Sequence, residues 1–145
     1  MSLNESTEAL VDVASAPLKV APGRRALLRF AVVERLVLAQ SLLPRHLQIL
    51  VVAGHGADDA AHLTGGAVDL ALFQVDDGVP AELPGCPGDP AAPAAPACLR
   101  LLSGALSASG LVNDAGRWWH WSYGDSSWAI ATGAAHARYG PVPGL

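Results

Sequence analysis

The sequence is poor in charge, in cysteine and above all in lysine. Only 15% of its 145 residues are charged, two are cysteines and one is a lysine. The formal net charge is -4, and no basic patch is visible, so we expect no nucleic-acid partner. Arg24, Arg25 and Arg29 form the densest positive run, which a solvated helix face explains more simply than a phosphate site.

A membrane span is also missing. The longest apolar stretch, 26–43, is interrupted by Arg29, Glu34 and Arg35, whereas a span needs about 20 mostly uncharged residues. The N-terminal sequence MSLNESTEAL has neither a basic start nor an apolar core, so it does not resemble a signal peptide. We therefore expect a cytoplasmic protein without a membrane partner.

The two cysteines, Cys86 and Cys98, bracket a proline-rich segment. In a reducing cytosol they are expected to be free thiols, and a surface-loop disulfide is the alternative. No Cys-x-x-Cys pair is present, which excludes a zinc ribbon.

Hydrophobic residues are abundant, at 51%, which excludes an intrinsically disordered chain. The length suits a single domain over residues 1–145. Within it we expect a weakly ordered N-terminal segment, 1–22, and a loop over the proline-rich residues 78–97. The excess of arginine over lysine, with much Ala, Gly and Pro, indicates a GC-rich bacterial genome.

Hydrophobic periodicity predicts two main helices and a small antiparallel sheet, which is an α+β fold. Apolar residues at helical spacing define the helices, and β-branched or alternating runs define the strands. The predicted helices are 24–43, which Pro44 ends, and 99–110; the predicted strands are 47–53, 67–75, 118–123 and its hairpin partner 128–132.

Three residues form a pattern typical of a metal site. His62 precedes Asp69 by seven residues, with the pair Gly65-Gly66 between them. A buried acid among apolar neighbours needs a partner, and His62, carried back over the glycine turn, is suited to share a metal ion with it. His120 lies in the run Trp118 to Trp121, where indoles provide a dry surrounding.

Two histidines and one aspartate leave a fourth coordination position open, as in catalytic zinc sites. The same donors suit Fe(II) in facial-triad oxygenases. A simpler interpretation than a metal site is that His120 is a buried core histidine whose ring nitrogens are hydrogen-bonded within the protein.

Both segments resemble the D-alanyl-D-alanine dipeptidases and carboxypeptidases, zinc peptidases grouped with lysostaphin and the metal-binding domain of hedgehog. Residues 60–69, AAHLTGGAVD, are similar to the family motif S-x-H-x-x-G-x-A-x-D, and residues 117–125, RWWHWSYGD, to its E-x-x-H motif. The similarity extends roughly over residues 24–140. It implies the family fold, a zinc cofactor, and His62, Asp69 and His120 as its ligands.

The chain departs from that family at three catalytic positions. Arg117 stands where the family has its catalytic Glu, and an arginine stays protonated and cannot act as a general base. Ala60 replaces the motif serine, and Gly54-His55-Gly56 replaces a Gly-Tyr-Arg segment whose arginine stabilises the transition state.

Arg117 and His55 are the candidate catalytic residues. Arg117 is expected near the open metal position, where its fork suits a carboxylate or an oxyanion; a solvent-facing side chain is the alternative. His55 is a candidate acid or base because its ordinary pKa is about 6.5. A solvent-exposed loop histidine is the alternative for His55. Asp58 and Asp59 are candidates to replace the lost glutamate as a base, but a solvated loop explains them more simply.

These residues favour a divergent zinc metalloenzyme acting on a small amino-acid- or dipeptide-derived substrate. The metal would act as a Lewis acid, which needs no glutamate base. Cyclisation, elimination or isomerisation in a biosynthetic pathway fits this chemistry. The alternatives are a D-alanyl-D-alanine dipeptidase with a relocated base, a non-catalytic zinc-binding protein, and an Fe(II) oxygenase.

Overall fold

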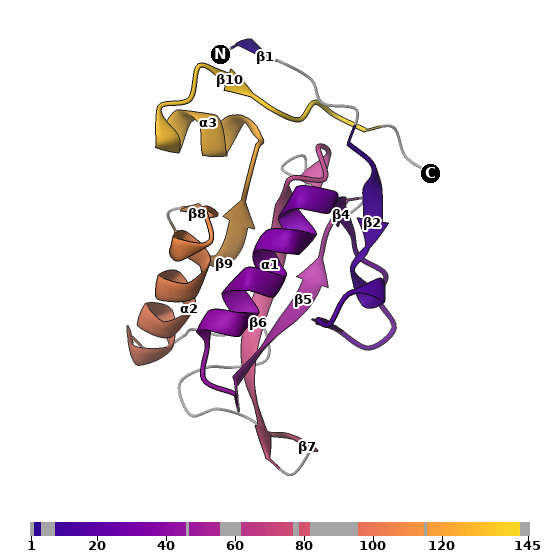
Figure 1. The fold of residues 1–145 in the computed structure, drawn as a ribbon, viewed down its shortest axis with the longest axis vertical. Coiled ribbons are helices and arrows are strands. Elements are labelled where there is room, and N and C mark those ends of the chain that lie inside the picture. The colour runs from indigo at the N-terminus through magenta and orange to yellow at the C-terminus, as the bar shows by residue number, and fades with distance from the viewer. Residues whose placement is uncertain are drawn as a thin grey trace.

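The computed structural model describes residues 2–3, 8–45, 47–55, 62–76, 79–81, 96–114 and 116–142. Figure 1 shows the arrangement of the chain. Its elements, in chain order, are β1 (Ser2–Leu3), β2 (Leu10–Asp12), the 3-10 turn η1 (Val13–Ser15), β3 (Lys19–Val20), β4 (Leu27–Arg29), α1 (Phe30–Leu42), β5 (Leu47–Ala53), β6 (Ala67–Asp76), β7 (Val79–Ala81), α2 (Pro96–Ala108), β8 (Val112–Asp114), β9 (Arg117–Ser122), α3 (Ser126–Thr132) and β10 (His136–Ala137).

The main sheet has the strand order β3-β5-β6-β9-β8, and β7 pairs with the end of β6. All its pairings are antiparallel except that of β3 with β5. With α1 and α2 as its two long helices, the protein is α+β, which confirms the predicted fold class. Two smaller pairings, β1 with β10 and β2 with β4, lie outside this sheet.

One face of the main sheet forms the hydrophobic core with α1 and α2. Figure 1 shows α1 crossing β5 and β6, with α2 beside β9. Side chains alternate between the two faces of a strand, so every second residue of β5 and β6 meets the helices. These core residues are Leu47, Ile49 and Val51 of β5, Val68, Leu70 and Leu72 of β6, Val32, Val33, Leu36 and Ala39 of α1, and Leu102 and Leu106 of α2. The residues between them, including Asp69, belong to the opposite face.

The first helix begins later than predicted. Residues 27–29 form β4, which pairs with β2, and α1 starts at Phe30. The backbone before the helix is occupied by tertiary hydrogen bonds: Leu27 accepts from the amide of His55, and the amide of Arg29 donates to Gly65. Apolar periodicity alone could not reveal these long-range bonds.

The predicted strand 128–132 is wrong, because these residues belong to helix α3. Asp125 precedes the helix and accepts a hydrogen bond from the amide of Trp128 at 2.9 Å, as an N-cap residue does. Gly133 ends the helix in the left-handed region at φ 72°. The cap signals at both ends outweigh the β-rich composition of Trp-Ala-Ile-Ala-Thr.

Other boundaries agree with the predictions or refine them. The strand predicted at 47–53 is confirmed as β5, and the one at 67–75 as β6, one residue longer. Residues 8–22, expected to be weakly ordered, contain β2, η1 and β3. Of the predicted loop 78–97, residues 79–81 form β7 and Pro96 begins α2, while 78 and 82–95 lie outside the described residues.

Cys98 is disulfide-bonded, so the free-thiol prediction is wrong for this residue. Cys86, the other cysteine of the chain, lies outside the described residues. Because disulfides persist mainly in oxidising compartments, the cytoplasmic assignment stays a prediction. Among the described helices, none is both long and apolar enough to span a membrane.

Buried Arg29 ties together three distant segments. Its guanidinium donates to the carbonyls of Glu8 at 2.6 Å, Thr64 at 2.8 Å and Gly140 at 3.2 Å. The ring of Tyr139 lies under it, 4.9 Å from the guanidinium carbon, and the Tyr139 hydroxyl donates to the Glu8 carboxylate at 2.8 Å. We call Glu8, Arg29 and Tyr139 the arginine cluster. It fixes the turn that precedes β6.

Candidate metal centre

Three strands place small and polar side chains at one level of the sheet face opposite the two long helices. In the β-ladder, Asp69 of β6 lies opposite His120 of β9 on one side and opposite Ala53 of β5 on the other. The register of β5 shifts between Val51 and Ala53, which is a β-bulge. Directly opposed residues share a face and bring their Cβ atoms within about 5.5 Å. The ladder therefore aligns Ala53, Asp69 and His120 side by side.

The turn before β6 brings His62 to the same place. Gly65 has φ 72°, a conformation that side chains other than glycine rarely adopt. A Cβ on Gly66 would lie 2.6 Å from the carbonyl oxygen of Tyr123, so this position also requires glycine. The turn is fixed from outside by Arg29, whose backbone and side chain bind the carbonyls of Gly65 and Thr64.

His62, Asp69 and His120, hereafter the histidine cluster, each offer one ligand atom within 4.8 Å of the others. His120 Nδ1 donates to Asp69 Oδ1 at 2.7 Å. His62 Nε2 lies 3.3 Å from the same oxygen, and the two imidazoles meet edge to face with centroids 5.1 Å apart. The structure thus brings the three predicted ligands together, although Asp69 and His120 are 51 residues apart in the sequence.

His62 is buried without satisfying its own polar atoms. Its side chain is 1% exposed, and within the described part of the chain neither Nδ1 nor Nε2 has a hydrogen-bond partner. The approach of Nε2 to Asp69 is close but is not aligned as a hydrogen bond. Leaving a polar atom buried and unpaired costs about 1–3 kcal/mol, so such atoms in a native protein call for an explanation. A metal ion bound at Nε2 would supply one for that nitrogen.

Asp69 is held ionised. Burial by itself raises the pKa of its carboxyl, but the hydrogen bond from His120, the close approach of His62 and the charges of both imidazoles outweigh burial and hold that pKa well below its ordinary value. A carboxylate that is ionised at neutral pH is ready to bind a cation. Its side chain is 21% exposed, so the cluster is reachable from solvent.

The donor set and spacing fit a divalent metal ion. Donor atoms of a tetrahedral zinc site, about 2.0–2.1 Å from the ion, lie roughly 3.3 Å from one another, which matches the separation of His62 Nε2 and Asp69 Oδ1. The shorter bond from His120 carries a proton that metal binding would release. Imidazole and carboxylate donors suit zinc and Fe(II) alike. The residues therefore could hold a metal ion, but they do not identify it.

Asn113 of β8, which the sequence did not point to, holds the backbone of β9 at His120. Its side-chain amide donates to the backbone carbonyls of His120 and of Arg117, each at 3.0 Å. These bonds fix β9 at the point where its pairing with β8 is irregular. Only the bulged pairing of β8 with β9 reveals the role of this residue.

Arg117 pairs with Asp114 across the same hairpin. Its Nε donates to Asp114 Oδ2 at 2.7 Å, and its Nη2 binds the same oxygen. The Arg117 side chain is 34% exposed. The Arg117 guanidinium, which was expected to face the metal position, thus forms an ion pair with Asp114. A catalytic role for Arg117 stays a prediction.

His55 lies just beyond the end of β5, two residues after Ala53. Its Nε2 donates to the carbonyl of Val142 at 2.8 Å, so Nδ1 is the acceptor nitrogen of the neutral ring. Its role as an acid or base also stays a prediction. His46, Asp58, Asp59 and Ala60 lie outside the described residues, and Asp125 acts structurally, as the cap of α3.

The arginine cluster was also missed. Arg29 was assigned to a solvated helix face, but it is 5% exposed and bonded to three carbonyls. A signal was present, since Arg29 stands alone within the apolar run 26–33. A charged residue flanked so closely by apolar ones on both sides is a candidate for burial.

Comparison with protein-family models and with curated proteins found no match to this chain. The resemblance to the D-alanyl-D-alanine peptidases therefore remains an interpretation of the two motifs. The geometry of the histidine cluster stands independently of it.

Proposed function

We propose that the protein is a zinc-dependent enzyme that uses His62 Nε2, Asp69 Oδ1 and His120 Nδ1 as metal ligands. Its substrate would be a small molecule derived from an amino acid or a dipeptide. The observation that carries the proposal is the buried His62, whose two unpaired ring nitrogens lie beside an ionised carboxylate.

Zinc is favoured over iron by the resemblance of the two motifs to zinc peptidases. Three protein ligands leave a coordination position for substrate, which is the arrangement of catalytic rather than structural zinc. When bound, the metal would supply Lewis-acid polarisation of a substrate carbonyl. The partial exposure of Asp69 leaves this position open to a small molecule.

The chain's own residues argue against simple peptide hydrolysis. The position of the peptidase glutamate holds Arg117, and its guanidinium is bound to Asp114. His55 is the remaining described candidate for a base, with Nδ1 as its free acceptor. We therefore favour a reaction in which polarisation of the substrate suffices: cyclisation, elimination or isomerisation. A dipeptidase with a relocated base, or a zinc-binding protein without catalysis, is the competing function.

The first experiment is the metal content of the protein purified without chelators, by elemental mass spectrometry. The native protein should carry close to one zinc per chain, and His120→Ala should carry almost none. His136→Ala is the matched control, because His136 is an exposed histidine of β10. Iron in place of zinc would favour the oxygenase, and a native protein that takes up no metal would refute the proposal.

The second experiment separates a repurposed scaffold from an active dipeptidase. If the native protein does not cleave D-alanyl-D-alanine and Arg117→Glu does, the scaffold has lost hydrolysis and gained another reaction. Cleavage by the native protein would instead establish the dipeptidase alternative. Zinc without turnover of any amino-acid-derived compound would favour a binding protein.

A further inference from the structure

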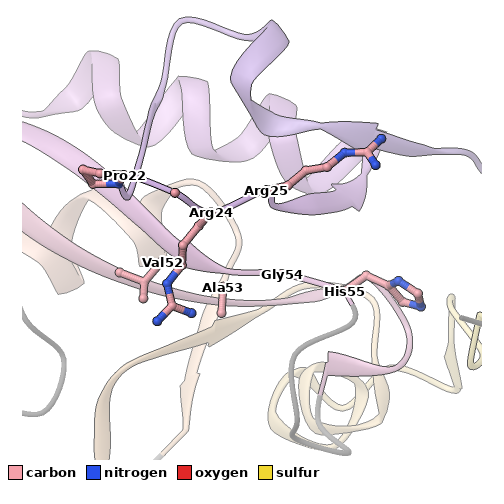
Figure 2. Close-up of a pocket in the computed structure, with 8 residues that line it drawn as sticks. Pro22, Arg24, Arg25, Val52, Ala53, Gly54 and His55 are labelled. Atoms are coloured by element: carbon pink, nitrogen blue, oxygen red, sulfur yellow. The ribbon is translucent and has the colours of Figure 1, made fainter. Parts of the chain in front are cut away.

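A cavity of about 500 Å³ opens at the end of β5. Figure 2 shows its lining, which comes from the loop before β4 and from the end of β5. Two arginines and a histidine line it, and none of its lining residues is acidic. The full lining is Pro22, Gly23, Arg24, Arg25, Val52, Ala53, Gly54 and His55. Its polar character is therefore cationic.

The two arginines differ in their partners. Arg25 Nε lies 3.5 Å from a carboxylate oxygen of Asp12, so its charge is already balanced. Within the part of the chain that the structure describes, the guanidinium of Arg24 has no hydrogen bond or ion pair. Arg24 is thus the cation of this cavity that is free to bind an anion.

Ala53 joins the cavity to the histidine cluster. It lines the cavity, and it lies directly opposite Asp69 in the ladder. Because of the bulge between Val51 and Ala53, Ala53 pairs with Asp69 and lies on the same sheet face as Asp69. Figure 2 shows the Arg24 side chain and the Ala53 methyl group directed to the same side of β5 in the cavity that both line. One strand spacing, about 5 Å, separates Ala53 from the metal ligand.

This placement suits a substrate with two polar ends. A guanidinium presents a planar fork that matches a carboxylate or a phosphate with two hydrogen bonds. An anion held by Arg24 would lie in the cavity that Ala53 lines, and Ala53 is one strand away from Asp69. The small side chain of Ala53 leaves the space between the cavity and Asp69 open.

We propose that Arg24 binds the anionic group, a carboxylate or a phosphate, of the small molecule whose other polar group the metal holds. The inference rests on the proposed metal centre and narrows its substrates to small anions. It also assigns a use to part of the arginine run that the sequence alone suggested was a solvated helix face.

The test uses hydroxamates, which bind zinc through one end. Succinate monohydroxamate carries a carboxylate at its other end, its primary amide is the uncharged match, and 3-phosphonopropanohydroxamate carries a phosphonate. Their affinities for the zinc-loaded protein are measured by calorimetry. In the native protein we expect one charged probe to bind about tenfold more tightly than the amide. The probe with the larger gain identifies carboxylate or phosphate as the natural group.

Two variants locate the effect. Arg24→Gln should reduce the preference for the charged probe to less than about twofold while the amide binds as before. Arg25→Gln, a change of the same kind in the same cavity, should leave the preference intact, because Asp12 already balances Arg25. Zinc content is measured in all three proteins. A native protein without zinc refutes the metal centre; a zinc-loaded protein whose preference is absent, or unchanged in Arg24→Gln, refutes only the role of Arg24.

Discussion

The arginine cluster and the histidine cluster are both buried polar groups, and they differ in how completely their atoms are paired. Arg29 binds three carbonyls, and the Tyr139 hydroxyl binds the Glu8 carboxylate. In the histidine cluster Asp69 is well bonded, but both nitrogens of His62 are left without a hydrogen bond. A satisfied network stabilises a fold, whereas buried polar atoms without partners call for an explanation, which the proposed metal ion would supply for His62 Nε2. The first cluster fixes the turn that delivers His62 to the second.

The largest loss of stability is expected from Arg29→Met. The substitution keeps an apolar stem but leaves three carbonyl oxygens without their donor, and we expect the free energy of unfolding to fall by about 4 kcal/mol. Urea denaturation at pH 7 measures it. Arg25→Gln, at an exposed site, should lose less than about 0.5 kcal/mol. A loss below about 1 kcal/mol in Arg29→Met would show that the cluster does not stabilise the fold.

Metal should stabilise the protein through the histidine cluster alone. At free zinc about 100 times its dissociation constant, the free energy of unfolding should rise by about 2.7 kcal/mol. Asp69→Asn replaces the ionised ligand with a neutral amide and should abolish this gain. Urea denaturation of both proteins with and without zinc makes the comparison. An equal gain in the variant would mean that zinc binds elsewhere.

Tyr139→Phe should cost about 2 kcal/mol at pH 7, because it removes a hydrogen bond to a carboxylate. Burial, with the Glu8 carboxylate as hydrogen-bond partner, raises the pKa of Tyr139 in the folded protein. The stabilisation is therefore present below the unfolded pKa of about 10 and is lost as the pH rises beyond it. The stability difference between native and variant should narrow between pH 7 and pH 11. A difference that is constant over this range would contradict the assignment.

Among the substitutions in the two buried clusters, the smallest effect on stability is expected from His62→Leu in metal-free protein. The change removes two unpaired polar atoms but also a charge partner of Asp69, so the free energy of unfolding should stay within about 1 kcal/mol of the native value. Zinc binding should be lost entirely. This contrast with Arg29→Met is the sharpest test of the comparison. A loss of several kcal/mol would place His62 among the structural residues.

Local sequence patterns were sufficient for β5, β6 and β9, and the motif resemblance singled out the three residues that the structure brings together in the histidine cluster. The glycine pair correctly marked the turn behind His62. Long-range bonds were beyond such patterns. The start of α1 depends on an amide bond from Arg29 to Gly65, and the orientation of Arg117 depends on Asp114 across a bulged hairpin. Helix α3 could have been predicted from the sequence, since Asp125 and Gly133 are residue types that commonly cap helices.

The spacing of the ligands along the chain has a consequence for folding kinetics. His62 and Asp69 are neighbours on one turn and strand, but His120 joins Asp69 only after the chain between them has closed a loop and β9 has paired with β6. A slip of one residue in that pairing would turn His120 to the other face. The entropy cost of closing this loop comes before the contact between β6 and β9 can stabilise the chain. We therefore expect the complete cluster to form late in folding. Metal capture during refolding would then report the moment at which β6 and β9 reach their native register.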